Sequence, residues 1–137
     1  MPDRSVDAFF YGLFMDVDVL RENQVTPVNP RPAYVEGFVL RIGKRATLLP
    51  SLGGRAFGML VALTHRELGR LYSGPGLEQY RPEAVLARTL AGELAAALCY
   101  NLPAAALPEE RNPDYAVRLQ AVLRKLNFPP EYVASIV

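Results

Sequence analysis

Short apolar stretches, separated by proline and glycine, run along most of this chain and predict a sheet with few helices. Twelve prolines and ten glycines divide the 137 residues into short pieces, which favours strands and turns over a bundle of helices. A first apolar run at residues 8–11 ends at Gly12 and predicts a buried strand followed by a tight turn. β-prone apolar patterns predict three more strands, at residues 33–42, 45–49 and 55–63.

Segments rich in proline or glycine connect these strands. Residues 26–32 hold three prolines and predict a loop, because proline cannot donate a hydrogen bond to a neighbouring strand. Residues 51–54, Ser-Leu-Gly-Gly, predict a turn before the strand at 55–63. Gly58 lies inside that strand, where a glycine indicates a bulge or the close approach of another backbone segment.

Capping residues and apolar spacing predict short helices. Thr64 and Glu67 form a capping box, in which the Thr oxygen accepts from a main-chain N–H and the Glu side chain bonds back. Asn112 followed by Pro113 is a second helix start, because Asn caps well and proline suits the first helical position. The expected helices cover residues 15–22, 64–72, 112–126 and 130–136.

The two segments on either side of Gly92 fit two structures. Their alanine content favours helices at residues 83–90 and 93–100, whereas the central glycine permits a hairpin of two strands. With either assignment, β segments outnumber helices in the first half of the chain and the C-terminus is helical. The pattern therefore predicts an α+β domain built on a curled sheet or a small barrel.

Composition excludes several classes of function. The length predicts one compact domain spanning residues 1–137. The formal charge of +1, without a run of basic residues, argues against a nucleic-acid partner. The longest apolar run, residues 94–100, is too short to span a membrane, and the polar N-terminus has no signal-peptide core. His65 and Cys99 are the sole residues of their types, so neither an internal disulfide nor a usual zinc site is expected, and a bacterial cytoplasm fits this composition.

The order of several motifs from about residue 9 onward resembles that of the gamma-glutamyl cyclotransferase-like family. The resemblance implies a small, mostly antiparallel β-barrel with flanking helices, and it therefore favours strands on both sides of Gly92. The segments that carry it are Phe10-Tyr11-Gly12-Leu13-Phe14-Met15, Ala33-Tyr34-Val35-Glu36-Gly37-Phe38-Val39-Leu40, Ala56-Phe57-Gly58-Met59-Leu60 with Leu63-Thr64, Tyr80-Arg81 with Val85, Ala97-Leu98-Cys99-Tyr100, Asn112-Pro113-Asp114-Tyr115 and Pro129-Pro130-Glu131-Tyr132.

The resemblance also implies a reaction. In this family the free α-amine of a γ-glutamyl group attacks its own γ-carbonyl, so that 5-oxoproline forms and the attached amine leaves, without a cofactor. A carboxylate would take a proton from the amine and return it to the leaving nitrogen. Main-chain N–H groups of the opening turn would hold the substrate carboxylate. By this resemblance, the expected substrate-binding residues are Tyr11, Gly12, Leu13, Phe14, Tyr72, Tyr80 and Tyr100.

The sequence departs from the family at the catalytic carboxylate. The family glutamate lies in a Leu-Asp-x-x-Glu-Gly segment, and the closest stretch here, residues 68–73, has Gly69 at the Asp and Tyr72 at the Glu. Glu78 is the candidate for a displaced catalytic carboxylate. Three hypotheses stay open: an active cyclotransferase that uses Glu78, a non-catalytic relative that binds a small carboxylate or amine, and an interaction domain whose cavity is filled by side chains.

Overall fold

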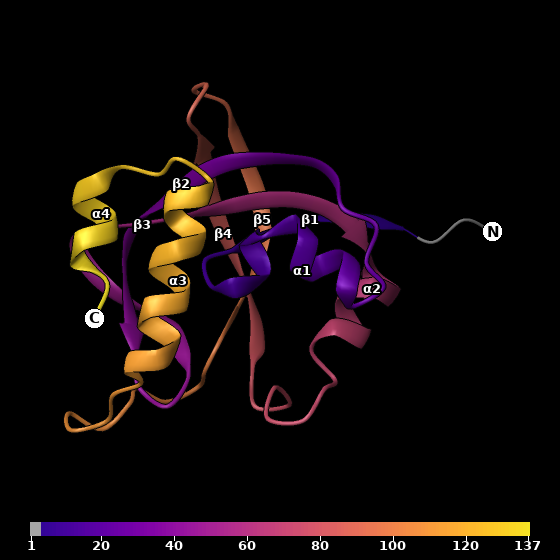
Figure 1. Ribbon diagram of the computed structural model, residues 1–137. Coiled ribbons are helices and arrows are strands. Elements are labelled where there is room, and N and C mark those ends of the chain that lie inside the picture. The colour runs from indigo at the N-terminus through magenta and orange to yellow at the C-terminus, as the bar shows by residue number, and fades with distance from the viewer. Residues whose placement is uncertain (1–3) are drawn as a thin grey trace.

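Five strands close into a barrel in the computed structural model, which describes residues 4–137 (Figure 1). Their order around the barrel is β1-β3-β2-β4-β5. All neighbouring strands are antiparallel except β1 and β5, which meet in a parallel pairing of Ala8 with Leu98. The strands are β1 (Ser5–Phe10), β2 (Val28–Ile42), β3 (Ala46–Thr64), β4 (Arg81–Thr89) and β5 (Leu94–Asn101). This arrangement confirms the expected α+β class and the mostly antiparallel barrel.

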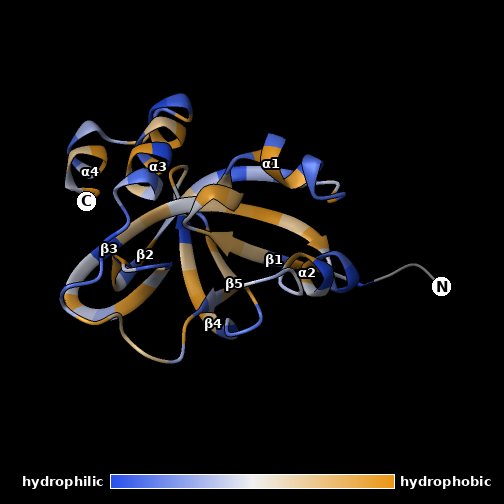
Figure 2. Cartoon of the chain, turned by 60° about the horizontal axis from the view of Figure 1, so that its bottom comes forward, coloured by the Kyte–Doolittle hydropathy of each residue, from blue (hydrophilic) through white to orange (hydrophobic). Residues whose placement is uncertain are grey.

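Short helices flank the barrel, as expected. Figures 1 and 2 show α1, α3 and α4 together on one side of the strands, with α2 near the end of β3. The capping box is confirmed, because Thr64 Oγ1 accepts from the Glu67 N–H at 3.0 Å and Glu67 accepts from the Thr64 N–H at 2.9 Å. The helices are η1 (Leu13–Met15), α1 (Val17–Glu22), α2 (His65–Leu71), α3 (Pro113–Lys125) and α4 (Pro130–Ser135).

The alanine-rich segments on either side of Gly92 are strands, which agrees with the resemblance rather than with helix propensity. On β4, Val85 and Ala87 are buried while Leu86 between them is exposed. On β5, Ala97 and Cys99 are buried in the same alternating way. Because one face of each strand packs into the barrel, burial outweighs the local preference of alanine for a helix.

The loop predicted at residues 26–32 is wrong beyond its first two residues, because β2 begins at Val28. Two of the three prolines therefore lie within a strand. Residues 28–32 of β2 pair with β3, whereas the pairing of β2 with β4 covers only residues 33–35. Proline is tolerated in a strand where no neighbouring strand needs a hydrogen bond from its backbone nitrogen.

The turn predicted at residues 51–54 is also wrong, because β3 continues through it. The pairing with β2 moves from Glu36 opposite Arg55 to Phe38 opposite Pro50, so four residues of β3 bulge out opposite Gly37. Gly37 and Gly53 have φ of +83° and +80°, which glycine adopts without strain. The glycines therefore bend one long strand, and they do not reverse the chain.

Gly58 provides the close backbone approach that the sequence indicated. A Cβ at this position would collide with the main-chain oxygen of Phe10 in the neighbouring strand β1. The last residues of β1 and the turn after it are thereby held tightly against β3. This packing fixes the place where the cavity described next begins.

Candidate functional site

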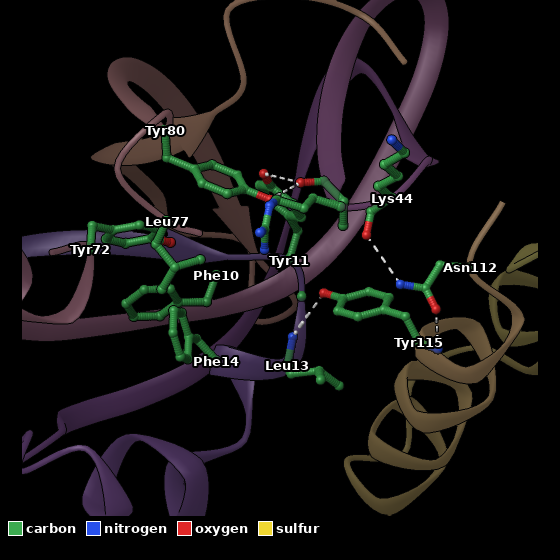
Figure 3. Close-up of a pocket in the computed structure, with 13 residues that line it drawn as sticks. Phe10, Tyr11, Leu13, Phe14, Lys44, Tyr72, Leu77, Tyr80, Asn112 and Tyr115 are labelled. Atoms are coloured by element: carbon green, nitrogen blue, oxygen red, sulfur yellow. Dashed lines mark hydrogen bonds between the residues drawn. The ribbon is translucent and has the colours of Figure 1, made fainter. Parts of the chain in front are cut away.

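A cavity of about 260 Å³ opens where β1 runs into η1 (Figure 3). Segments far apart in the sequence form its wall: the end of β1 with η1, the turn between β2 and β3, the end of α2 with the loop before β4, and the start of α3. Its volume lies just below the usual range of about 300–1,000 Å³ for small-molecule sites. The lining residues are Phe10, Tyr11, Gly12, Leu13, Phe14, Lys44, Arg45, Ala46, Tyr72, Leu77, Tyr80, Asn112 and Tyr115.

Two tyrosines are fixed in the wall by main-chain carbonyls. The Tyr11 hydroxyl donates to the Tyr100 carbonyl oxygen at 2.7 Å and lies 3.5 Å from that of Ala46. The Tyr80 hydroxyl donates to the same Ala46 oxygen. Both polar ends are therefore occupied by the barrel, and these side chains offer a bound molecule mainly their aromatic rings.

Tyr115 joins the turn after β1 to helix α3. The Leu13 N–H donates to the Tyr115 hydroxyl oxygen at 3.3 Å, and a Cβ on Gly12 would collide with that oxygen. Within residues 4–137 the Tyr115 hydroxyl donates no hydrogen bond of its own, so its proton can serve an anion in the cavity. Tyr115 lies in one of the motifs that carry the resemblance, but it was not among the expected substrate-binding residues. Its position three residues after the cap Asn112, on the first turn of α3, was the available signal.

Tyr72 lies directly after α2 and reaches the cavity, as the resemblance implied for that position. Figure 3 shows the Tyr72 and Tyr80 rings extending from one side of the cavity and that of Tyr115 from the other. Tyr72 stacks on Tyr100, with ring centroids 4.0 Å apart, and meets Phe14 edge-on at 5.7 Å. Tyr100 itself is not among the lining residues, so its predicted contact with a ligand stays a prediction.

Burial keeps the phenols of the cavity protonated. It raises the pKa values of Tyr11 and Tyr72 well above the ordinary 10.0, and that of Tyr80 to about 12. Burial also raises the pKa of Tyr115. At neutral pH these groups therefore act as hydrogen-bond donors and not as proton acceptors.

Glu78 is exposed on the loop before β4 and is not among the residues that line the cavity. Its main-chain oxygen accepts from the Arg81 guanidinium at 2.7 Å. The neighbouring Leu77 side chain and that of Tyr80 are the parts of this loop that line the cavity (Figure 3). The catalytic role of Glu78 stays a prediction, and its placement lends that role no support.

Two cations, Lys44 and Arg45, contribute to the wall, and neither was among the expected site residues. Lys44 Nζ lies 3.9 Å from Glu110 Oε2. Arg45 makes no ion pair within residues 4–137, and its guanidinium lies so close to Gly76 that a Cβ there would collide with it. No Asp or Glu in the described part of the chain lines the cavity. The polar character of this site therefore comes from hydroxyls and positive charge.

Metal-binding and membrane-spanning features were sought in the same residues. Across residues 4–137, no three His, Cys, Asp or Glu side chains gather closely enough to hold a metal ion. Over that same range, no helix has the length and apolar character needed to cross a membrane.

Known structures share this barrel and the helices around it. A structure described as a gamma-glutamyl cyclotransferase superposes with a TM-score of 0.78 at 17% sequence identity, covering 98% of this chain and 89% of that one. YkqA from Bacillus subtilis superposes with a TM-score of 0.77 at 22% identity, covering 96% of this chain and 52% of that one. This chain has the gamma-glutamyl cyclotransferase-like fold.

A third structure with the cyclotransferase-like fold, an AIG2-like protein from Mus musculus, superposes with a TM-score of 0.60 at 18% identity. The match covers 78% of this chain and 82% of that one. This chain spans about half the length of YkqA. No protein-family profile matches the sequence, and no curated protein matches it by sequence. At these identities the likeness establishes the fold, and the activity has to be argued from the site.

Proposed function

We propose that this protein binds a small organic acid in the cavity and does not cyclise γ-glutamyl compounds. The observation that carries the proposal is Tyr72. It lines the cavity at the position where the resemblance places the catalytic glutamate, and no carboxylate lines the cavity within residues 4–137.

The cyclisation reaction needs a proton acceptor beside the attacking amine. An α-ammonium cannot attack a carbonyl until it has lost a proton, and a side chain near the reaction must take that proton. The pKa of Tyr72 is raised well above 10.0 by burial, so its phenol does not accept protons at neutral pH. Glu78, the remaining candidate, would need its loop to turn so that the carboxylate replaced Leu77 in the cavity.

The same wall suits a carboxylate attached to a compact apolar body. Tyr115 can donate its proton to the anion while its oxygen stays bonded to the Leu13 N–H. The rings of Phe10 and Phe14 then cover the apolar part. A hydrogen bond to a charged group contributes about 1.5–3 kcal/mol, so one such donor accounts for roughly a tenfold to hundredfold gain in affinity.

Two measurements on the same preparation test this proposal. The protein is incubated with several γ-glutamyl amines and assayed for 5-oxoproline, and its melting temperature is measured with increasing concentrations of small carboxylic acids. We expect no 5-oxoproline and a rise in melting temperature with the acid. Release of 5-oxoproline that disappears in Glu78→Gln would instead establish a cyclotransferase with a displaced base.

Variants locate the binding site. Tyr115→Phe removes the donor and keeps the ring, so we expect affinity for the acid to fall about tenfold or more. Tyr34→Phe is the matched control, because Tyr34 lies under the Arg55 guanidinium and not in the cavity. Equal loss of affinity in both variants would show that the acid binds elsewhere.

A further inference from the structure

We propose that Arg45 determines which acids the cavity accepts, and that it selects acids without a free ammonium group. This inference rests on the proposed function and narrows its ligand class. The charged side chains in the wall are both cations, Lys44 and Arg45, and no carboxylate of the described residues lines the cavity. An α-amino acid would bring an ammonium group into surroundings that already carry positive charge.

Of the two cations, Arg45 has the greater effect on which acids the cavity accepts. Lys44 lies 3.9 Å from Glu110, so part of its charge is balanced. Arg45 is exposed and forms no ion pair within residues 4–137, and its guanidinium lies beside the main chain of Gly76. A guanidinium beside an opening offers several N–H donors in one plane, which matches a carboxylate.

The acceptors that an ammonium group would need are already used. The Ala46 carbonyl oxygen in the wall accepts from the Tyr80 hydroxyl, and Tyr11 lies 3.5 Å from the same oxygen. The Tyr100 carbonyl oxygen accepts from Tyr11 at 2.7 Å. An ammonium group would therefore have to share these carbonyl oxygens with the tyrosines in return for its lost water, which is unfavourable for a charged group.

The chemistry of the wall thus fits a monocarboxylic acid with a compact apolar or aromatic body. An amine in such a molecule has to be absent or acylated, because an amide nitrogen carries no charge. Six aromatic side chains line the cavity and can cover an aromatic body: Phe10, Tyr11, Phe14, Tyr72, Tyr80 and Tyr115.

A matched set of three probes isolates the ammonium group. 3-Phenylpropanoate and phenylalanine share one carbon skeleton and differ in the α-ammonium, and N-acetylphenylalanine removes the charge while keeping the nitrogen. Each is titrated into the full chain by calorimetry at pH 7. We expect 3-phenylpropanoate and N-acetylphenylalanine to bind at least tenfold more tightly than phenylalanine.

Substitution of Arg45 tests its part in this selection. In Arg45→Gln we expect the affinity for 3-phenylpropanoate to fall about tenfold and the preference over phenylalanine to fall below about threefold. In Arg45→Glu a carboxylate faces the ligand, and phenylalanine should become the better ligand of the two. Arg88→Gln is the matched control, since Arg88 is exposed at the end of the hairpin of β4 and β5 and should change neither affinity. Melting temperatures of the variants check that each is folded.

The outcomes separate this inference from the proposed function. If phenylalanine binds the unaltered protein as tightly as 3-phenylpropanoate, selection against the ammonium is wrong while acid binding stands. If selection is unchanged in Arg45→Gln, Arg45 is not its determinant. If none of the three probes binds, the proposed function and this inference both fail.

Discussion

Tyr72 and Tyr100 stack face to face, with ring centroids 4.0 Å apart and ring planes 7° apart. The first residue follows α2 and the second is on β5, so the pair joins the wall of the cavity to the barrel. Tyr100 thereby sets the position of Tyr72 even though it is not among the lining residues itself. These two predicted binding residues therefore have different roles: Tyr72 forms part of the cavity wall, and Tyr100 supports Tyr72.

Replacing Tyr100 should therefore affect both stability and the cavity. We expect Tyr100→Ala to lower the free energy of unfolding by about 2–4 kcal/mol, from lost apolar burial and lost ring contact. Denaturant unfolding measures this change. Tyr100→Phe keeps the stacked ring and should cost less than about 1 kcal/mol. A large loss in Tyr100→Phe would mean that the hydroxyl, and not the stacking, supports the fold.

Gly12 and Tyr115 should be coupled energetically. A Cβ on Gly12 would collide with the Tyr115 hydroxyl, so we expect Gly12→Ala to destabilise the protein by about 1–3 kcal/mol. Tyr115→Phe removes the hydroxyl and with it the collision. In that variant, Gly12→Ala should lower the free energy of unfolding by at least about 1 kcal/mol less than it does in the unaltered protein. A double-mutant cycle from denaturant unfolding measures this difference. Strictly additive effects would contradict the contact.

Lys125 should make stability depend on pH at both ends of the scale. Its ammonium lies 3.0 Å from carboxylate oxygens of Asp16 and Asp18, which connects α3 to the start of α1. Hydrogen bonding and charge from Lys125 lower the pKa of Asp18 below 3.8, and the hydrogen bonds that Lys125 donates to Asp18 and Asp16 raise the pKa of Lys125 above 10.5. The contribution of Asp18 to the stability of the folded protein is present above pH 3.8, and it is lost as the pH falls through the pKa of Asp18 in the folded state. The contribution of Lys125 to that stability is present below pH 10.5, and it is lost as the pH rises through the pKa of Lys125 in the folded state.

Thermal unfolding of Lys125→Met at a series of pH values tests this contact. We expect the variant to melt at a lower temperature than the unaltered protein near pH 7, with the difference shrinking below pH 3.8 and above pH 10.5. Lys44→Met is the control, because Lys44 lies 3.9 Å from its nearest carboxylate and is mostly exposed. A constant difference across the whole range would show that Lys125 acts through packing alone.

Cys99 should be chemically inert while the protein is folded. Burial, and then the negative charge of Glu83, raise the pKa of its thiol to about 12. Because the thiolate is the reactive form, iodoacetamide at pH 8 should leave Cys99 unmodified in the native protein and alkylate it after denaturation. Mass spectrometry distinguishes the two states. Rapid alkylation of the native protein would place the thiol at an accessible surface.

Local rules predicted the parts of the fold that depend on neighbouring residues. The capping box at Thr64 and the start of α3 at Asn112 are both determined by side chains within three residues, and both are confirmed. The bulge at residues 51–54 was mistaken for a turn because its glycines permit either structure, and only the pairing of β3 with β2 decides between them. The first five residues of β2, from Val28 to Pro32, were missed for the same reason, since proline is excluded only where a partner needs its donor.

Residues of the candidate site that lie in a motif of the resemblance could be proposed from the sequence. Residues that the fold brings in from distant segments were missed. Tyr72 was found from its place in a segment that resembles the family pattern, and it lines the cavity. Tyr115 was missed because it reaches the Leu13 N–H across 102 positions of sequence, and its place beside the cap Asn112 does not tell which distant segment it contacts. Arg45 looks like a solvated charge in a turn until the loop at Gly76 is brought beside it.

The bond between Leu13 and Tyr115 makes the docking of α3 and the occupancy of the cavity linked equilibria. If the cavity binds an acid as proposed, whatever detaches this helix also opens one wall and releases that acid, and the acid in return favours the docked helix by the same free energy. The start of α3 is thus a part of the cavity wall and not only a cover for the strands. A partner protein that bound the face of α3 that carries Tyr115 would cause release of the ligand without contacting the ligand itself.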